Sequence, residues 1–208
     1  MRLLILGASG KTGHHLVTQT LARGDEVVAY LRAPDKLLIT DPRLHKIGGQ
    51  VSDDKALRRA LFGCDAVISA LGSGNGTLTA LAHTLIPAMN ETGTKRLVSL
   101  VGAGVQMPGD PTSIGRTVML TLMRLVAAGV LNDATEHARL VLASSLDWTL
   151  VRPPRLMQGL PTGKIEHAAQ LALGPSASIT RADLAAFMLT LVTGDQYVRI
   201  APMVANKN

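Results

Sequence analysis

The sequence predicts an α/β fold in three layers, in which helices cover both faces of a doubly wound parallel β-sheet. Two observations lead to this fold class. Six short runs rich in Leu, Val and Ile alternate with longer helical patterns along the 208-residue chain. Runs such as LLIL and LVSLV are apolar at nearly every position, as strands are when helices cover both sides of a sheet. The expected strands are residues 2–6, 26–31, 44–47, 66–70, 96–101 and 148–151.

The ends of the first two helices are marked by residues that commonly stand at helix termini. A helix is expected over residues 11–23, ending at Gly24, because glycine readily takes the left-handed conformation that closes a helix. Ser52 is expected to cap a second helix over residues 53–61.

Two further helices are expected in the second half of the chain. Thr180, with Asp183 three residues later, resembles a capping box and predicts a helix over residues 181–192. The apolar stretch 117–131 is interrupted by Arg124 and is shorter than the roughly 20 residues that a membrane-spanning helix needs. We therefore expect a buried or amphipathic helix there and no membrane partner.

Proline and glycine are concentrated after the fifth and sixth expected strands, in residues 102–115 and 153–175. In an open parallel sheet, loops that follow strands lie at the carboxyl edge, where ligands bind. We expect substrate-side loops at about 102–132 and 153–178. The segment 102–115 is the candidate lid, because its glycines and prolines break secondary structure.

Length and composition favour a single domain over residues 1–208. The net charge is +6, but the basic residues are scattered without an aromatic surface, so anionic small ligands are expected rather than nucleic acid. Cys64 stands alone and forms no intrachain disulfide, and the opening MRLLILGASG has too short an apolar run for a signal peptide. The expectation is a cytoplasmic monomer or homodimer.

A glycine-rich turn directly follows the first expected strand and precedes the first helix. Its spacing, G-x-x-G-x-x-G, permits a tight turn, a close approach of the backbone to a diphosphate and close packing of the helix on the strand. The N–H groups that open the helix would then face the diphosphate. This context predicts a dinucleotide-binding fold of the Rossmann type. The residues expected to hold the diphosphate are Gly7, Ala8, Ser9, Gly10, Lys11, Thr12 and Gly13.

The run Gly10, Lys11 and Thr12 also resembles the end of the phosphate loop of nucleoside triphosphatases. That loop needs another glycine five residues before Gly10, where this chain has Ile5 inside the expected strand. The loop would be too short, so we disfavour a triphosphatase.

The end of the second expected strand indicates which dinucleotide binds. A site selective for NAD usually has Asp or Glu there, to bind the ribose 2′-hydroxyl. This chain has Arg32, followed about one helical turn later by Lys36. Charge-assisted bonds from a guanidinium to a 2′-phosphate are worth roughly 1.5–3 kcal/mol each. We therefore expect NADP(H) to be preferred over NAD(H).

Five segments together resemble the atypical short-chain dehydrogenase/reductase family: GASGKTG, LRAPDK, DAVISALG, SSLDWTLVRPP and SITRADLAAFML. Within this family the likeness is greatest to the NmrA-like proteins and to the biliverdin-IXβ reductase or flavin reductase group. The resemblance spans nearly the whole chain. It implies a Rossmann fold with NADP(H) lying over the carboxyl ends of the strands.

The resemblance also implies cofactor contacts beyond the glycine turn. Ala70, Leu71 and Gly72 would lie beside the adenosine ribose, while Pro153 and Pro154 would flank the nicotinamide.

Two departures from the family pattern affect the adenine site and catalysis. After the third strand the family often has Gly-Asp, whereas this chain has Gly49 and Gln50; the Gln50 amide, followed by Val51, is therefore expected beside the adenine. A Thr-Ser pair follows the fifth strand in the flavin reductase group, and here those positions are Val101 and Gly102.

The proton-transfer groups of related enzymes are also missing. The family's Pro-Pro-His becomes Pro-Pro-Arg, which places a permanent charge at Arg155, the candidate catalytic residue, expected to orient an anionic or carbonyl substrate. The usual Tyr-x-x-x-Lys pair is absent, because Pro34 and Ala201 stand four residues after Tyr30 and Tyr197.

Other polar candidates have ordinary structural explanations. Glu136 and His137, near the start of an expected helix, are interpreted as a solvated helix end rather than as substrate contacts. Ser99 and Ser113 lack a plausible His or Asp partner in the sequence, and Cys64 is expected to be a small core or surface residue. No metal is expected, because the histidines lack ligand spacing. They are His14, His15, His45, His83, His137 and His167.

These observations favour an oxidoreductase that passes a hydride from NADPH to a flavin-like, quinone-like or carbonyl acceptor and uses little side-chain acid–base catalysis. A non-catalytic NADP(H)-binding redox sensor is the alternative. Sugar-nucleotide epimerase or dehydratase activity ranks last, because the Tyr-Lys pair is missing.

Overall fold

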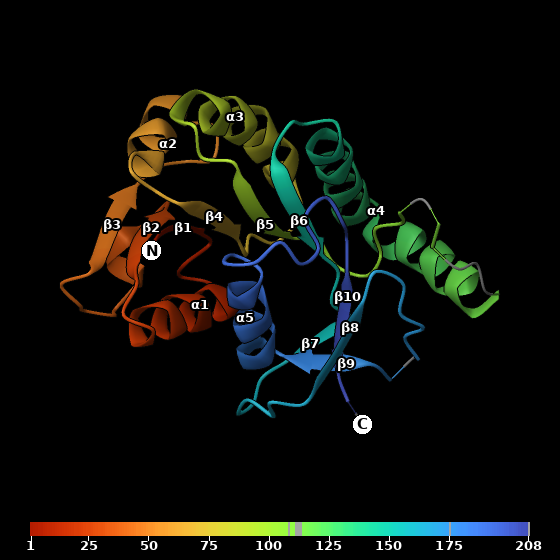
Figure 1. Ribbon diagram of the computed structural model, residues 1–208. Helices are drawn as coiled ribbons and strands as arrows, with labels where there is room; N and C mark the ends of the chain where they lie inside the picture. Colours follow the sequence, from red (N-terminus) through yellow and green to blue (C-terminus); the bar gives the residue numbers. More distant parts are fainter. Residues whose placement is uncertain (108, 111–113, 175, 208) are drawn as a thin grey trace.

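The protein is built on one six-stranded parallel sheet (Figure 1). The computed structural model describes residues 1–107, 109–110, 114–174 and 176–207, with only the backbone for 114–126. The strand order β3-β2-β1-β4-β5-β6 is that of the Rossmann fold, so the predicted fold class is confirmed. The strands are β1 (Arg2–Leu6), β2 (Glu26–Leu31), β3 (Leu44–Gly48), β4 (Ala66–Ser69), β5 (Arg96–Leu100) and β6 (Asp147–Val151).

Helices cover both faces of this sheet (Figure 1). One face is covered by α1 (Lys11–Ala22) and α5 (Arg181–Thr190). The other face is covered by α2 (Asp54–Leu61), α3 (Thr77–Thr92) and α4 (Ile114–Leu142). Side chains of a strand alternate between the two faces, and most residues of the six strands are therefore apolar.

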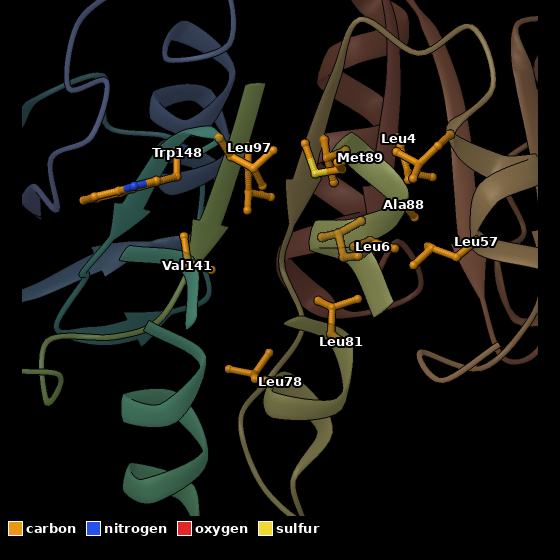
Figure 2. Packing of buried hydrophobic residues seen from close by; sticks show 14 of the residues in the cluster. Leu4, Leu6, Leu57, Leu78, Leu81, Ala88, Met89, Leu97, Val141 and Trp148 are labelled. Atoms are coloured by element: carbon orange, nitrogen blue, oxygen red, sulfur yellow. The ribbon is translucent and has the colours of Figure 1, made fainter. Parts of the chain in front are cut away.

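The core on the α2–α3–α4 face shows how the layers are held together. Leu4, Leu6 and Leu97 project from the central strands toward Leu81 and Met89 of α3 (Figure 2). All five side chains are fully buried. Burial of each side chain stabilises the fold by about 1.5–3 kcal/mol relative to exposure. This packing holds the central strands, whose carboxyl ends form the site, in place against α3.

Short strands that were not expected lie beyond the main sheet. Residues 153–178, expected as a loop, contain β7 (Arg155–Met157) and β8 (Ile165–Ala168). β7 pairs with β9 (Ser178–Thr180), and β8 pairs with β10 (Met203–Asn206). The loop interpretation was wrong here, because runs of three or four residues carry too little periodicity to be recognised. A 3₁₀ helix, η1 (Pro34–Lys36), follows β2.

The predicted starts of α1 and α5 are confirmed, and these helices end one and two residues before their predicted ends, whereas the predicted cap of α2 was wrong. Gly24 has a φ of +86°, as a left-handed helix terminus requires. Ser52 does not cap α2: the N-cap is Asp53, whose carboxylate accepts the Ala56 N–H at 3.0 Å. An ionised acceptor at this position also interacts favourably with the helix dipole.

At α5 the predicted cap is present in half of its expected form. The Thr180 hydroxyl accepts the Asp183 N–H at 3.1 Å. Asp183 does not return a bond to the Thr180 N–H, which instead donates to the side chain of Asn206 at 2.8 Å. The C-terminal strand β10 therefore completes this capping box.

The apolar stretch 117–131 lies in α4, which has non-helical backbone angles at Ala127 (φ −139°, ψ 39°). No helix in the described ranges is both long and apolar enough to cross a membrane. Ser113 and part of the candidate lid 102–115 lie outside the described residues.

Candidate functional site

The glycine turn after β1 has the backbone geometry that its sequence predicted. Gly7 has a φ of +78°, and its carbonyl oxygen accepts the Gly10 N–H at 2.9 Å. A Cβ placed on Gly13 would lie 2.0 Å from the Gly7 carbonyl oxygen. Only glycine fits at Gly13, because no Cβ tolerates such a contact, and the first turn of α1 thereby packs directly on the turn.

The surface of this turn suits an anion. Ser9, Gly10 and Lys11 are exposed, whereas Ala8 and Thr12 are buried. Gly10 precedes α1 and offers no side chain to cap its first amides, and the first turn of α1 contains no acidic residue. A helix N-terminus without a cap or an acid is a good diphosphate-binding site. The residues present therefore fit the diphosphate of a dinucleotide.

The turn faces the end of β4 across the point where the strand order reverses. A Cβ on Gly7 would lie 3.0 Å from the backbone carbon and oxygen of Ala70 and 3.1 Å from the Leu71 nitrogen. Gly72 is exposed, and a Cβ there would meet no described atom within 4 Å. Such a switch point is where dinucleotides bind in doubly wound sheets, and the structure brings Ala70, Leu71 and Gly72 to it.

On the other side of the turn, the ends of β2 and β3 carry the residues expected at the adenosine half. Arg32 follows β2 directly, Lys36 ends η1, and both are exposed. The Tyr30 hydroxyl donates to the Gln50 carbonyl oxygen at 2.7 Å. A Cβ on Gly49 would lie 2.1 Å from that hydroxyl. Tyr30 therefore fixes the turn that presents the exposed Gln50 side chain.

Val51, the other residue expected beside the adenine, is half-buried and packs against the core. Its carbonyl oxygen accepts the hydroxyl of Thr84 in α3. Its side chain offers apolar contact rather than a hydrogen bond.

Beside the glycine turn lies an open hollow of about 440 Å³. Four cationic or titratable side chains line it, those of Lys11, His14 and His15 from α1 and that of Arg181 from α5. Burial and the neighbouring charges of His14 and Arg181 lower the pKa of His15. The lining residues are Ser9, Gly10, Lys11, His14, His15, Gln158 and Arg181.

The segment after β6 carries the residues expected beside the nicotinamide. Pro153 is buried, and its carbonyl oxygen accepts the Ala103 N–H at 2.9 Å. Pro154 is half-buried and Arg155, the first residue of β7, is exposed. Arg155 is thus accessible to a ligand at the carboxyl edge of the sheet.

The sequence interpretation of Ser99 and His137 was wrong. Ser99 does have a histidine partner: its hydroxyl oxygen lies 3.0 Å from Nε2 of His137, and both side chains are fully buried. His137 lies well inside α4 and is not a solvated helix end. Glu136 faces outward and pairs with Arg139 at 2.6 Å. The error arose because Ser99 and His137 are 38 residues apart and only the packing of α4 on the sheet joins them.

Sequence reasoning also missed a buried ion pair near the site. Arg152, directly after β6, lies 2.5 Å from Asp110, and the side chains are 1% and 6% exposed. The pair anchors Asp110, part of the expected substrate-side loop, to the end of β6. The clue in the sequence was an arginine beside a proline pair at a strand end.

Within the ranges that the structure describes, no three His, Cys, Asp or Glu side chains lie close enough to hold a metal ion. Cys64 is buried, and burial raises the pKa of its thiol to about 11.

Comparisons with known proteins agree with this geometry. The sequence matches the family described as NAD(P)H-binding over residues 7–195. A 3-beta-hydroxysteroid dehydrogenase from Mycolicibacterium neoaurum is 33% identical over 110 residues, which are 50% of this chain and 30% of that protein. The match thus spans less than a third of that relative.

Two solved structures share the fold over the whole chain. ChuY, an anaerobillin reductase from Escherichia coli, has a TM-score of 0.83 and 20% identity, with 100% of this chain and 98% of that chain covered. A short-chain dehydrogenase/reductase from Veillonella parvula, solved in complex with NADP, has a TM-score of 0.81 and 15% identity, with 100% and 95% covered.

Proposed function

The chain belongs to the NAD(P)H-binding family, and we propose that within it the protein is a reductase that uses NADPH to reduce a flavin-like, quinone-like or carbonyl acceptor. The observation that carries the proposal is the uncapped, acid-free N-terminus of α1 behind the glycine turn, set against the end of β4. When bound there, NADPH supplies a hydride from its nicotinamide.

The chain's own residues supply binding and orientation. The exposed backbone of Ser9 and Gly10 meets the diphosphate, and Arg32, with Lys36 nearby, meets the 2′-phosphate. Pro153 and the exposed Arg155 flank the hydride-donating end. The NADP-bound Veillonella structure with the same fold supports this choice of dinucleotide.

The acceptor is inferred from the groups that the site lacks. The Tyr30 hydroxyl donates to the Gln50 carbonyl oxygen and the Tyr197 hydroxyl bonds to His167, and neither tyrosine has a lysine four residues later to form the usual proton-transfer pair. Val101 and Gly102 carry no hydroxyl. Flavins and quinones suit such a site, because their own electronics drive reduction and positioning supplies most of the acceleration. The reductase described for ChuY, which has the same fold, supports this reaction class.

Charge favours an acceptor with an anionic group. The hollow beside the turn is lined by Lys11 and Arg181, and Arg155 lies exposed after the sixth strand. Cations around an open site raise the local concentration of anionic substrates.

Stopped-flow oxidation of NADPH against a panel of acceptors tests this function. The panel contains riboflavin, FMN, a neutral quinone and a carboxylated quinone. We expect multiple turnovers, with a lower KM for FMN and the carboxylated quinone than for their neutral partners. Absence of turnover with every acceptor, together with tight NADPH binding, would instead support the redox sensor.

A further inference from the structure

The loop between β4 and α3, residues 70–76, has an unusual backbone. Gly74, Asn75 and Gly76 have φ values of +135°, +53° and +72°. Gly76 is the N-cap of α3 and has no side chain to satisfy the first amides of that helix. A loop of this kind needs a partner from elsewhere to hold one conformation, because its glycines are conformationally free and open helix amides cost free energy.

That partner is Asp133 of α4. Its carboxylate accepts the N–H groups of Leu78 at 3.2 Å and Thr79 at 2.9 Å, which are the second and third residues of α3. It also accepts the Gly74 N–H at 2.8 Å and the Thr79 hydroxyl at 2.8 Å. Asp133 therefore caps α3 in place of the missing side chain at Gly76, and the same carboxylate fixes the loop.

Asp133 is ionised in this position. Burial alone would raise the pKa of its carboxyl group, but the N–H donors of Gly74, Thr79 and Leu78 outweigh burial, and the pKa is lowered. An ionised carboxylate forms stronger hydrogen bonds than a neutral group would.

His137 lies one helical turn after Asp133, and both of its ring nitrogens form hydrogen bonds that hold the same part of α4. Its Nδ1 lies 3.0 Å from the carbonyl oxygen of Leu78, which can only accept, so Nδ1 carries the proton. Burial lowers the pKa of His137, which is therefore neutral. Its Nε2 then accepts the hydroxyl of Ser99 in β5. Asp133 and His137 thus join β5, α4 and the first turn of α3.

The far end of the same loop is the wall of the dinucleotide crevice. Ala70 and Leu71 lie so close to Gly7 that a single added Cβ would contact their backbone. A shift of the loop therefore changes the space in front of the glycine turn. We propose that Asp133 and His137 are positioning residues for dinucleotide binding, which hold loop 70–76 against the turn without touching the cofactor. This positioning role rests on the proposed function, because it requires that the crevice binds NADPH.

Fluorescence titration of NADPH into the folded full-length protein tests the proposal. We expect Asp133→Ala to raise the Kd of NADPH about tenfold, as expected from the loss of hydrogen bonds to one buried charge, and to change kcat at saturating NADPH by less than about twofold. Asp133→Asn retains an acceptor oxygen and should recover part of the affinity. Hydrogen exchange at residues 71–79 should accelerate in Asp133→Ala.

Asp183→Ala is the matched control. Asp183 is also a buried carboxylate that accepts backbone N–H groups, those of Thr162 and Gly163, and its hydrogen-bond partners belong to segments other than loop 70–76. The Asp183→Ala variant should have a lower melting temperature than the wild-type protein and an unchanged Kd of NADPH. Equal effects of both variants on Kd would overturn the proposal.

If Asp133→Ala does not fold, a variant with a smaller change can test the proposal. Thr79→Val removes one hydroxyl bond to Asp133 and should raise the Kd by a few-fold. If a variant shows faster hydrogen exchange at residues 71–79 but an unchanged Kd of NADPH, the positioning role is contradicted. A wild-type protein that binds no NADPH would instead overturn the proposed function itself.

Discussion

Arg32 is the residue on which the choice between the two nicotinamide dinucleotides depends. It directly follows β2 and is exposed at the carboxyl edge of the sheet, where an acid would be expected for NAD. We predict that Arg32→Asp raises the Kd of NADPH by about tenfold to a hundredfold, because a guanidinium is replaced by a charge that repels the 2′-phosphate. The Kd of NADH should change little or fall.

Lys95→Ala provides a control for the loss of a positive charge. Lys95 is exposed just before β5, at the opposite edge of the sheet. Titrations of both variants with NADPH and NADH at fixed ionic strength check the prediction. Equal weakening of NADPH binding in both variants would mean that net charge, and not Arg32, sets the preference.

Cys64 provides a prediction about reactivity. Its side chain is 7% exposed, and burial raises the pKa of the thiol to about 11. At pH 8 the thiolate fraction should then be roughly a hundredfold below that of an ordinary cysteine. We expect a chromogenic disulfide reagent to react at least about a hundredfold more slowly with the native protein than with the protein in guanidinium chloride. Similar rates would contradict this burial.

At the scale of elements, the N-terminus of α5 predicts a dependence of stability on pH. Burial alone would raise the pKa of Asp183, but hydrogen bonds from the Thr162 N–H, the Asn206 amide and the Gly163 N–H lower it to about 2. Because the folded-state pKa is below the unfolded value, this carboxylate stabilises the fold above about pH 4, and the contribution is lost as pH falls toward 2.

We predict that Asp183→Asn lowers the free energy of unfolding by roughly 2 kcal/mol at pH 7. The difference from the wild-type protein should shrink toward zero near pH 2. Urea denaturation at several pH values measures both. Asp54→Asn, at a carboxylate 49% exposed and paired with Arg58, should cost less than about 0.5 kcal/mol. A loss at Asp183 that does not vary with pH would contradict the assignment.

The six main strands and the glycine turn were predictable because their signals are local. Continuous apolar runs mark β1 and β5, and the spacing of Gly7, Gly10 and Gly13 encodes steric needs within seven residues of chain. The caps were less certain, because Ser52 and Asp53 are neighbours of similar capping strength and only the backbone path selects Asp53.

The hydrogen-bond network around α4 could not be predicted, because it joins residues that are far apart in the sequence. Asp133 meets Gly74 across 59 residues and His137 meets Ser99 across 38. No periodicity links such residues before α4 is packed on the sheet. The short strands β7 to β10 depend likewise on partners that are distant in the sequence, such as Arg155 paired with Ser178.

At the scale of the whole molecule, Arg152 joins segments that the main sheet does not connect. From the end of β6, its guanidinium donates to the carbonyl oxygens of Ala201 at 2.9 Å, Val105 at 3.2 Å and Ala169 at 3.2 Å. The same side chain pairs with Asp110. The loop after β5, the end of β8 and the segment before β10 therefore share one buried cation.

Replacement of Arg152 should lower the free energy of unfolding far more than replacement of a surface arginine. Arg152→Met removes one buried donor from the Asp110 carboxylate, which keeps the Met107 N–H, and one from each of three carbonyl groups. We predict a loss of about 3–5 kcal/mol in the free energy of unfolding. Arg139→Met breaks a pair whose side chains are 64% and 40% exposed and should cost less than about 1 kcal/mol. Guanidinium chloride denaturation of both variants measures the difference. Similar losses would show that the segments around β6 are held by apolar packing, with Arg152 contributing no more than a surface charge.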